Sequence, residues 1–207
     1  MTFSSIILFY SYNHFFSLFL LSIFFIGFIS DINILSSPKL RLFIQSILVI
    51  LFVLILDIKI YQTKFILLDM LLENTFFKYF FSVFCLLILI NGSNFIDGLN
   101  GLMLGYFLSI IFVVLNLDLH NYLEIDKNLI VNLIIILIYL LILNINAQLF
   151  MGDSGSYVLG LICGYLLIKI YEVNQEISPY FVILLLWYPC FENLFSIIRK
   201  FSFKRSP

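Results

Sequence analysis

The sequence carries very little charge. Only 11% of its 207 residues are charged, whereas a soluble domain carries about 25%. In contrast, 63% of the residues are hydrophobic, and the mean hydropathy is +1.13. This composition excludes an ordinary soluble domain and is typical of an integral membrane protein. The net charge of −1 and the lack of a basic run indicate no nucleic-acid partner.

Cysteine and histidine are also scarce. Cys85, Cys163 and Cys190 lie within or beside apolar runs and lack the spacing of metal ligands, so we interpret them as buried thiols. His14 and His120 are isolated and form no partner pattern with a carboxylate or a cysteine, and we interpret both as non-catalytic.

Long apolar runs fill most of the chain. A membrane span needs roughly 20 apolar residues. The first run lacks the basic start and the small-residue cleavage site of a signal peptide, so we interpret it as a membrane span as well. Seven runs qualify: Ile6–Ile29, Leu42–Ile60, Phe76–Ile90, Leu99–Leu115, Leu129–Ile145, Tyr157–Ile170 and Tyr180–Ile198. The third and the sixth are short, as expected where polar loops dip into the membrane. Since no linker or repeat interrupts them, we predict an all-α, polytopic transmembrane bundle forming one domain over residues 1–207.

The basic residues suggest an orientation. Lys39 and Arg41 lie in one loop, and Arg199 begins a basic tail on the same side by span parity, whereas acidic residues prevail on the other side. The positive-inside rule then places the first side in the cytoplasm. Three connecting segments are predicted there: Ser30–Arg41, Asn91–Gly98 and Asn146–Gly155.

Two polar, glycine-rich motifs, Asn91–Leu102 and Phe150–Ser156, interrupt the apolar runs. Polar residues at membrane depth are expected only where they line a cavity or its mouth. Four amide or carboxylate residues in the first motif are three apart and would share one face if its latter part were helical: Asn91, Asn94, Asp97 and Asn100. Their oxygens suit Mg²⁺ or Mn²⁺, although a helix-packing face is the alternative.

The second motif resembles the start of a helix. Asp153 or Ser154 would cap it, leaving free N–H groups directed at an anion, and capping alone would also explain the aspartate. Since each cytoplasmic segment contains an aspartate (Asp31, Asp97 or Asp153), we expect the three carboxylates to converge and bind a divalent cation with a phosphorylated substrate.

Basic and acidic residues elsewhere leave alternatives open. Lys39 and Arg41, close to Asp31, suit a phosphate site, but they would serve equally to fix topology. Glu192 precedes Arg199 by seven residues in the last apolar run. It is either a functional residue or the partner of a base.

Four segments together resemble the polyprenyl-phosphate N-acetylhexosamine-1-phosphate transferases, glycosyltransferase family 4. The asparagine-rich first motif is nearer the WecA-like than the MraY-like branch. The segments are Gly27–Gln45, Asn91–Gly105, Asn146–Gly160 and Pro189–Pro207. The resemblance implies that a polyprenyl (undecaprenyl) phosphate attacks a UDP-sugar and releases UMP, with Mg²⁺ or Mn²⁺, at the bacterial plasma membrane during cell-envelope polysaccharide synthesis.

The resemblance also implies roles for particular residues. Asp153 corresponds to the metal-binding aspartate, and Asn94 to an asparagine that reaches the metal or the pyrophosphate. Asp31 and Asp97 join Asp153 as catalytic positions. The substrate-binding positions are Asn91, Asn94, Asn100, Lys39 and Arg41. Whether the protein forms a homodimer is left open by the resemblance.

The chain departs from the family pattern in three ways. Ser30-Asp31 replaces the usual pair of acids, the chain stops at Pro207 before the family's histidine loop, and terminal spans are missing. We therefore expect a piece truncated at both ends and inactive alone. Two alternatives remain: a catalytically inactive paralogue acting as a membrane scaffold, and a small transporter or channel subunit.

Overall fold

The computed structural model describes residues 9, 12–174 and 176–203, and every regular element in that part of the chain is helical. In chain order the elements are α2 His14–Asp31, α3 Pro38–Ile55, α4 Ile66–Leu72, α5 Thr75–Ile96, α6 Leu102–Asn116, η1 Leu119–Leu123, α7 Lys127–Ile145, α8 Gly152–Val173 and α9 Pro179–Phe203. The prediction of an all-α protein is confirmed.

Six of these helices are long and apolar enough to cross a membrane: α2, α3, α5, α7, α8 and the Pro179–Arg199 part of α9. Helix α6 is apolar but shorter. Six spans and one shorter apolar helix agree with the expected bundle of about seven spans. Residues 6–8, 10 and 11 of the first predicted span lie outside the described residues.

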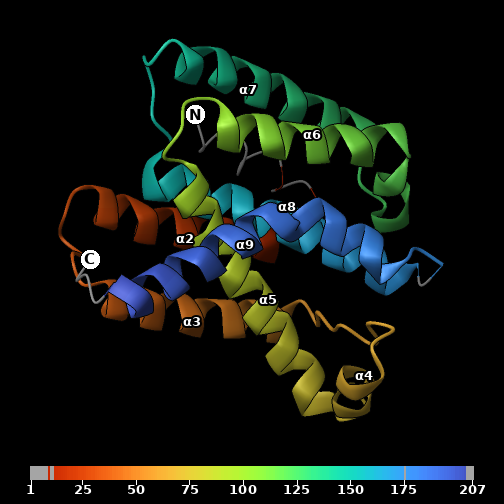
Figure 1. Cartoon of the computed structure of the whole chain (residues 1–207). Helices are drawn as coiled ribbons and strands as arrows, with labels where there is room; N and C mark the ends of the chain where they lie inside the picture. Colours follow the sequence, from red (N-terminus) through yellow and green to blue (C-terminus); the bar gives the residue numbers. More distant parts are fainter. Residues whose placement is uncertain (1–8, 10–11, 175, 204–207) are drawn as a thin grey trace.

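Helix α8 lies at the centre of the bundle. It packs against α2 and α5, while α6 and α7 lie side by side along one flank and α2 and α3 along the other (Figure 1). Ser156, Gly160 and Gly164 are four residues apart on α8, a spacing of small residues that lets helices approach closely. A Cβ atom at Gly160 would stand 3.1 Å from the Ile90 Cα atom and from the Leu89 carbonyl oxygen of α5, so the backbones of these two helices approach closely.

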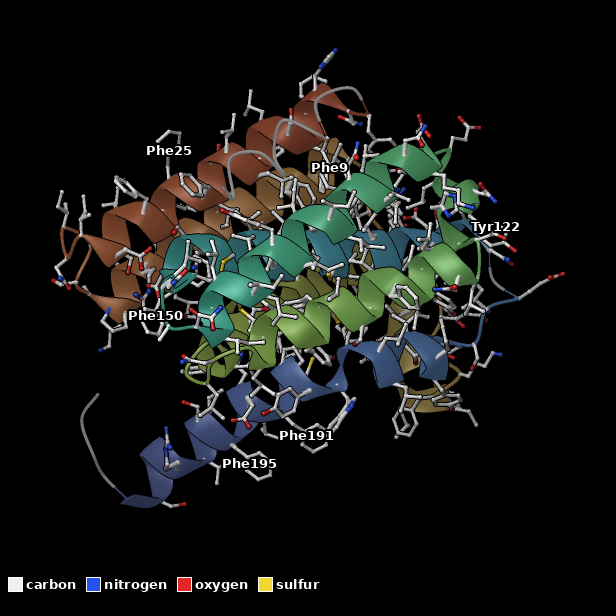
Figure 2. All side chains as sticks on the ribbon, turned by 90° about the horizontal axis from the view of Figure 1, so that it is seen from above. Phe9, Phe25, Tyr122, Phe150, Phe191 and Phe195 are labelled. Carbon is white, nitrogen blue, oxygen red and sulfur yellow. The ribbon has the colours of Figure 1, made fainter. Side chains whose placement is uncertain are left out.

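Helix α9 crosses α5 and then leaves the bundle. At the crossing, Gly92 of α5 lies against Pro189, too close to its carbonyl group for any side chain on Gly92 to fit. Proline inside a helix removes one backbone hydrogen bond and bends the helix. Figure 2 shows that the part of α9 carrying Phe191 and Phe195 runs away from the other helices.

The expectation that the third and sixth spans are short is wrong. Helices α5 and α8 each have 22 residues, because α5 continues through Asn91–Ile96 and α8 begins within the second motif. Asn91 Nδ2 donates to the Leu87 carbonyl at 2.9 Å, and Ser93 Oγ to the Leu89 carbonyl at 2.6 Å. These polar side chains bond to the preceding helical turn and so allow the helix to continue.

Candidate active site at the start of α8

Asp153, in the first turn of α8, is held by residues from two other helices. The Arg41 guanidinium of α3 lies 2.5 Å from Asp153 Oδ2, and the Ser30 hydroxyl of α2 donates to the same oxygen at 2.6 Å. The Asp153 and Arg41 side chains are 17% and 24% exposed, so this ion pair is shielded from solvent more than a surface pair. The first and third predicted segments therefore meet at one end of the bundle.

Asp31, the last residue of α2, caps helix α8. Its two carboxylate oxygens accept hydrogen bonds from the backbone N–H groups of Asp153 at 2.8 Å and Ser154 at 3.1 Å. The expectation that Asp153 or Ser154 caps this helix is wrong, because the N-cap position is Met151 and has no side-chain cap bond. A carboxylate of the protein, rather than a free anion, thus occupies the positive end of α8.

Gly152 makes room for this arrangement. Its φ of +63° is unfavourable for any residue with a side chain. A Cβ atom there would also stand 2.8 Å from each carboxylate oxygen of Asp31. Glycine is therefore required at this position both for the backbone conformation and for the approach of Asp31.

A chain of hydrogen bonds links Asp153 to Asn94 of α5. The Tyr157 hydroxyl donates to Asp153 Oδ2 at 3.2 Å, and Asn94 Nδ2 donates to Tyr157 at 3.5 Å. Ser156 Oγ donates to Asn94 Oδ1 at 3.4 Å. Neither Tyr157 nor Ser156 was among the site residues that the sequence predicted. The signal for Tyr157 is its position four residues after Asp153 on a helix, a spacing that places two side chains together.

Asp97 brings the third carboxylate to this end of the bundle. It follows the last residue of α5 and accepts a hydrogen bond from the Gly152 backbone. Burial raises the pKa of Asp97 to about 6; the charges of Asp31 and Asp153 also raise it, whereas the Gly152 bond opposes them. The three aspartates are therefore electrostatically coupled, as expected from span parity.

The first motif is not arranged as expected. Its earlier part is helical, whereas residues 97–101 form a turn in which Gly101 has a φ of +80°. Asn100 is exposed in this turn, and Asn91 bonds back to Leu87. The expected face shared by all four residues is wrong, because the helix ends at Ile96, before Asp97 and Asn100.

Asn144 is a buried positioning residue that the sequence did not indicate. Its Oδ1 accepts from the Gly101 N–H at 2.5 Å, and its Nδ2 donates to the Leu149 carbonyl at 2.8 Å. It is only 3% exposed. It therefore ties the turn after α5 to the segment that leads into α8.

Lys39 is separate from this cluster. It lies exposed in the first turn of α3, a helix capped by Ser37, and forms no hydrogen bond or ion pair with the described residues. Of the two predicted basic residues, only Arg41 contacts an aspartate.

The oxygen donors do not form a ready-made metal cage. Among the described residues, no three His, Cys, Asp or Glu side chains are grouped as metal ligands. However, Arg41, Ser30 and Tyr157 all contact Asp153 Oδ2, and within the described part of the chain Oδ1 accepts no hydrogen bond. One or two carboxylates with an open side suit Mg²⁺, which is usually completed by water and substrate phosphates.

The fold and the site define a polytopic helical membrane protein with a carboxylate-rich polar site at one end of its bundle. The model of the family described as glycosyl transferase family 4 matches residues 14–171, and the chain belongs to this family. It is therefore a membrane transferase of the kind that passes a sugar phosphate to polyprenyl phosphate. A comparison with curated proteins found no match.

Loss of the Asp31 cap should loosen the start of α8. Asp31→Ala is expected to lower the free energy of unfolding by about 1–2 kcal/mol, with Asp31→Asn intermediate because it keeps an acceptor without the charge. Asp126→Ala is the matched control, since Asp126 caps α7 at the opposite end of the bundle. The stability of each variant is measured by thermal unfolding in detergent.

The cap variants should also differ in transfer activity. Asp31→Ala should impair it, whereas Asp126→Ala should lose similar stability and keep it. If Asp31→Ala unfolds at the wild-type temperature, the capping role is contradicted.

Proposed function

We propose that this protein transfers N-acetylhexosamine 1-phosphate from a UDP-sugar to polyprenyl phosphate. An oxygen of the lipid phosphate attacks the β-phosphorus, the bond from that phosphorus to the bridging oxygen breaks, and UMP leaves. The observation that carries the proposal is Asp153, positioned at the start of α8 by Arg41, Ser30 and Asp31 in a family 4 chain. The lipid product would serve cell-envelope polysaccharide synthesis at the cytoplasmic face of the bacterial plasma membrane.

Magnesium is the proposed cofactor, with Mn²⁺ as a substitute. Asp153 through Oδ1 and Asn94 through its amide oxygen would hold the ion. When bound, it would neutralise charge on the diphosphate as UMP leaves. Arg41, whose guanidinium already lies at Asp153, would place a second positive charge at the phosphates.

The remaining residues would bind or position the substrates. Asp31 would hold the start of α8, and with it the backbone of Asp153, in a single orientation. Asp97 would fix the same turn through Gly152. Asn91, Asn100 and Lys39, none of which contacts Asp153, would contact the sugar nucleotide or the lipid phosphate.

The test is UMP release from UDP-N-acetylhexosamine, measured in membranes containing the full-length protein, with polyprenyl phosphate and Mg²⁺. Release that requires both the lipid phosphate and the metal is expected. Stoichiometric binding of the nucleotide sugar without release would instead favour the inactive scaffold. Solute flux without UMP would favour a transporter.

The proposed orientation predicts a labelling pattern. In a background without the native cysteines, Ser36→Cys, Gly98→Cys and Gln148→Cys each place an exposed thiol near one of the three aspartates. All three should resist an impermeant thiol reagent in intact cells and react after permeabilisation. Asn121→Cys, exposed at the opposite end, is the control that should react in intact cells. Labelling of any of the first three cysteines in intact cells would contradict the proposed orientation.

A further inference from the structure

Helix α3 buries one polar side chain in the bundle. Its buried residues lie on a single stripe at helical spacing: Gln45, Val49, Phe52 and Val53. Three of them are apolar, whereas Gln45, which follows Arg41 by one turn, carries an amide and is completely buried. Burying an amide costs free energy unless it is hydrogen-bonded. Packing alone would therefore favour an apolar side chain at position 45, and the amide needs another explanation.

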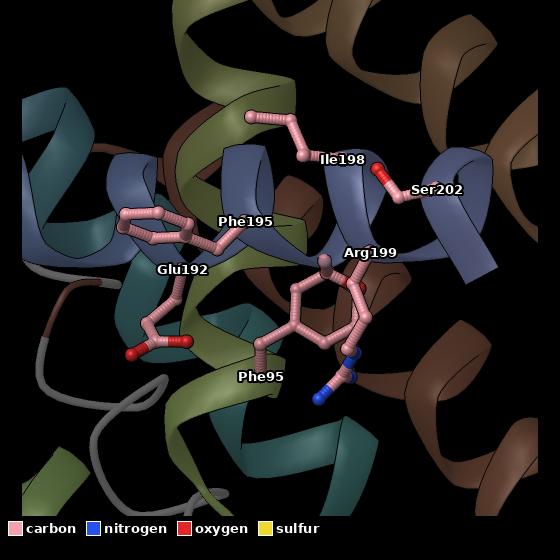
Figure 3. A pocket seen from close by; sticks show the side chains of 7 residues that line it. Phe95, Glu192, Phe195, Ile198, Arg199 and Ser202 are labelled. Carbon is pink, nitrogen blue, oxygen red and sulfur yellow. The ribbon is translucent and has the colours of Figure 1, made fainter.

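Neither polar atom of the Gln45 amide has a partner. Oε1 and Nε2 form no hydrogen bond of normal geometry with the described residues, although the amide lies against the Tyr157 hydroxyl of α8. Two other described residues also have an unpaired buried polar atom. Ser196 lines the pocket between α9 and the end of α5 (Figure 3), and His120 lies in η1. Gln45 differs from both because its neighbour belongs to the hydrogen-bond chain of the candidate active site.

Two amide donors lie beside the oxygen of the Tyr157 hydroxyl. A phenolic hydroxyl donates one hydrogen bond and also accepts. Here it donates to Asp153 Oδ2 at 3.2 Å and accepts from Asn94 Nδ2 at 3.5 Å. Asn94 therefore occupies the position that Gln45 Nε2 would need in order to donate to the same oxygen.

Asn94 is held only loosely in this arrangement. Its Nδ2 is 3.5 Å from the Tyr157 oxygen, and its Oδ1 is 3.4 Å from Ser156 Oγ, whereas strong bonds of these kinds measure about 2.7–3.2 Å. Such long bonds are weak, so the Asn94 side chain can rotate at little cost. In the proposed function its amide oxygen joins Asp153 in holding Mg²⁺. Rotation toward the metal would take the Asn94 donor away from Tyr157.

We propose that Gln45 is a positioning residue that donates to the Tyr157 hydroxyl when Asn94 turns toward the metal. Gln45 Nε2 then replaces Asn94 Nδ2, so that the Tyr157 proton stays directed at Asp153 Oδ2 and Oδ1 stays open. Because this hydrogen bond forms only in the metal-bound state, it adds to the affinity for the metal. The inference rests on the metal site of the proposed function, but it concerns metal binding and not the transfer step.

The test is Mg²⁺ binding to the purified full-length protein, measured without substrate as the shift in melting temperature with titrated Mg²⁺. Gln45→Met keeps the length of the side chain and removes the amide. Its melting temperature without Mg²⁺ should equal or exceed that of wild type, because an unpaired buried amide is lost. Its half-saturating Mg²⁺ concentration should rise about tenfold, as expected for losing one hydrogen bond of the bound state. Gln45→Leu is a second variant with the same expectation.

Two further variants control for packing and for the route of the effect. Val49→Ala, at a buried position on the same stripe, should lower the melting temperature by leaving a cavity and keep the wild-type response to Mg²⁺. Tyr157→Phe should weaken Mg²⁺ binding, and adding Gln45→Met should weaken it no further, because Gln45 acts through that hydroxyl. In UMP release, Gln45→Met should raise the KM for Mg²⁺ and keep kcat at saturating Mg²⁺.

The outcomes separate this inference from the transfer reaction. If Mg²⁺ stabilises wild type about tenfold more tightly than Gln45→Met but no UMP is released, the role of Gln45 stands and the transfer reaction is contradicted. Wild-type Mg²⁺ affinity in both Gln45 variants would overturn the inference, and so would additive losses with Tyr157→Phe. A large drop in melting temperature without Mg²⁺ would also overturn it, because the amide would then stabilise the free protein. No effect of Mg²⁺ on wild type would overturn the inference together with the metal site.

Discussion

Asp153→Asn is expected to lower the rate of transfer by about 10³-fold, equivalent to about 4 kcal/mol of transition-state stabilisation. The substitution keeps the size of the side chain and its acceptor for Ser30 and Tyr157, but it removes the charge that would hold Mg²⁺. The measurement is UMP release from UDP-N-acetylhexosamine at saturating polyprenyl phosphate, with Mg²⁺ titrated for each variant. The KM for Mg²⁺ should rise as the maximal rate falls.

Asp153→Asn also leaves Arg41 half-buried without its counter-ion, which can lower stability by itself. The double variant Asp153→Asn/Arg41→Gln removes both charges and should recover part of any lost stability, but not the rate. Asp126→Asn, at the start of α7, controls for removal of a carboxylate from a helix start. Near-normal UMP release by Asp153→Asn would exclude Asp153 as the metal ligand.

Gly27→Ala is expected to combine a loss of stability with a loss of activity. A Cβ atom at Gly27 would lie 2.7 Å from the carbonyl carbon of Asp153, and nearer still to Ser154 Cα. Helix α8 must therefore shift at the turn that carries Asp153. Overpacking of this kind costs about 1–3 kcal/mol, and a displacement of about 1 Å at a reacting group lowers rates by about 10²-fold.

Gly105→Ala is the matched control for Gly27→Ala. Gly105 is also helical, but a Cβ atom there would have no neighbour within 4 Å. Alanine should stabilise α6 slightly, by up to about 1 kcal/mol from helix propensity, and leave the rate unchanged. Thermal unfolding and UMP release are measured for both variants. If Gly27→Ala behaves like Gly105→Ala, the α2–α8 contact does not position Asp153.

The sequence indicated the all-helical class and the apolar helices that form the bundle correctly, because both depend on local hydrophobicity. A chain in a bilayer must satisfy its backbone hydrogen bonds within each segment, so a long apolar run becomes a helix. Helix ends were predicted less well. Asn91 and Ser93 resembled loop residues, but each bonds to a carbonyl in the preceding turn and extends α5.

The parity of the spans correctly brought Ser30, Asp31, Asp97 and Asp153 to one end of the bundle, and the motifs indicated the family that was later matched. Parity places residues at an end, but it contains no information about which atoms meet. The cap of α8 was assigned to its own first residues for this reason, since local sequence offers only local partners.

The sequence by itself determined the all-α transmembrane class, the family, and the end of the bundle at which the polar motifs gather. Only the tertiary structure decided that Asp31 caps a helix 122 residues away and that Arg41 pairs with Asp153 across 112 residues. The physical reason is that these partners depend on how closely α2 and α8 approach. That approach is set at Gly27, where the absence of one carbon atom lets two backbones touch.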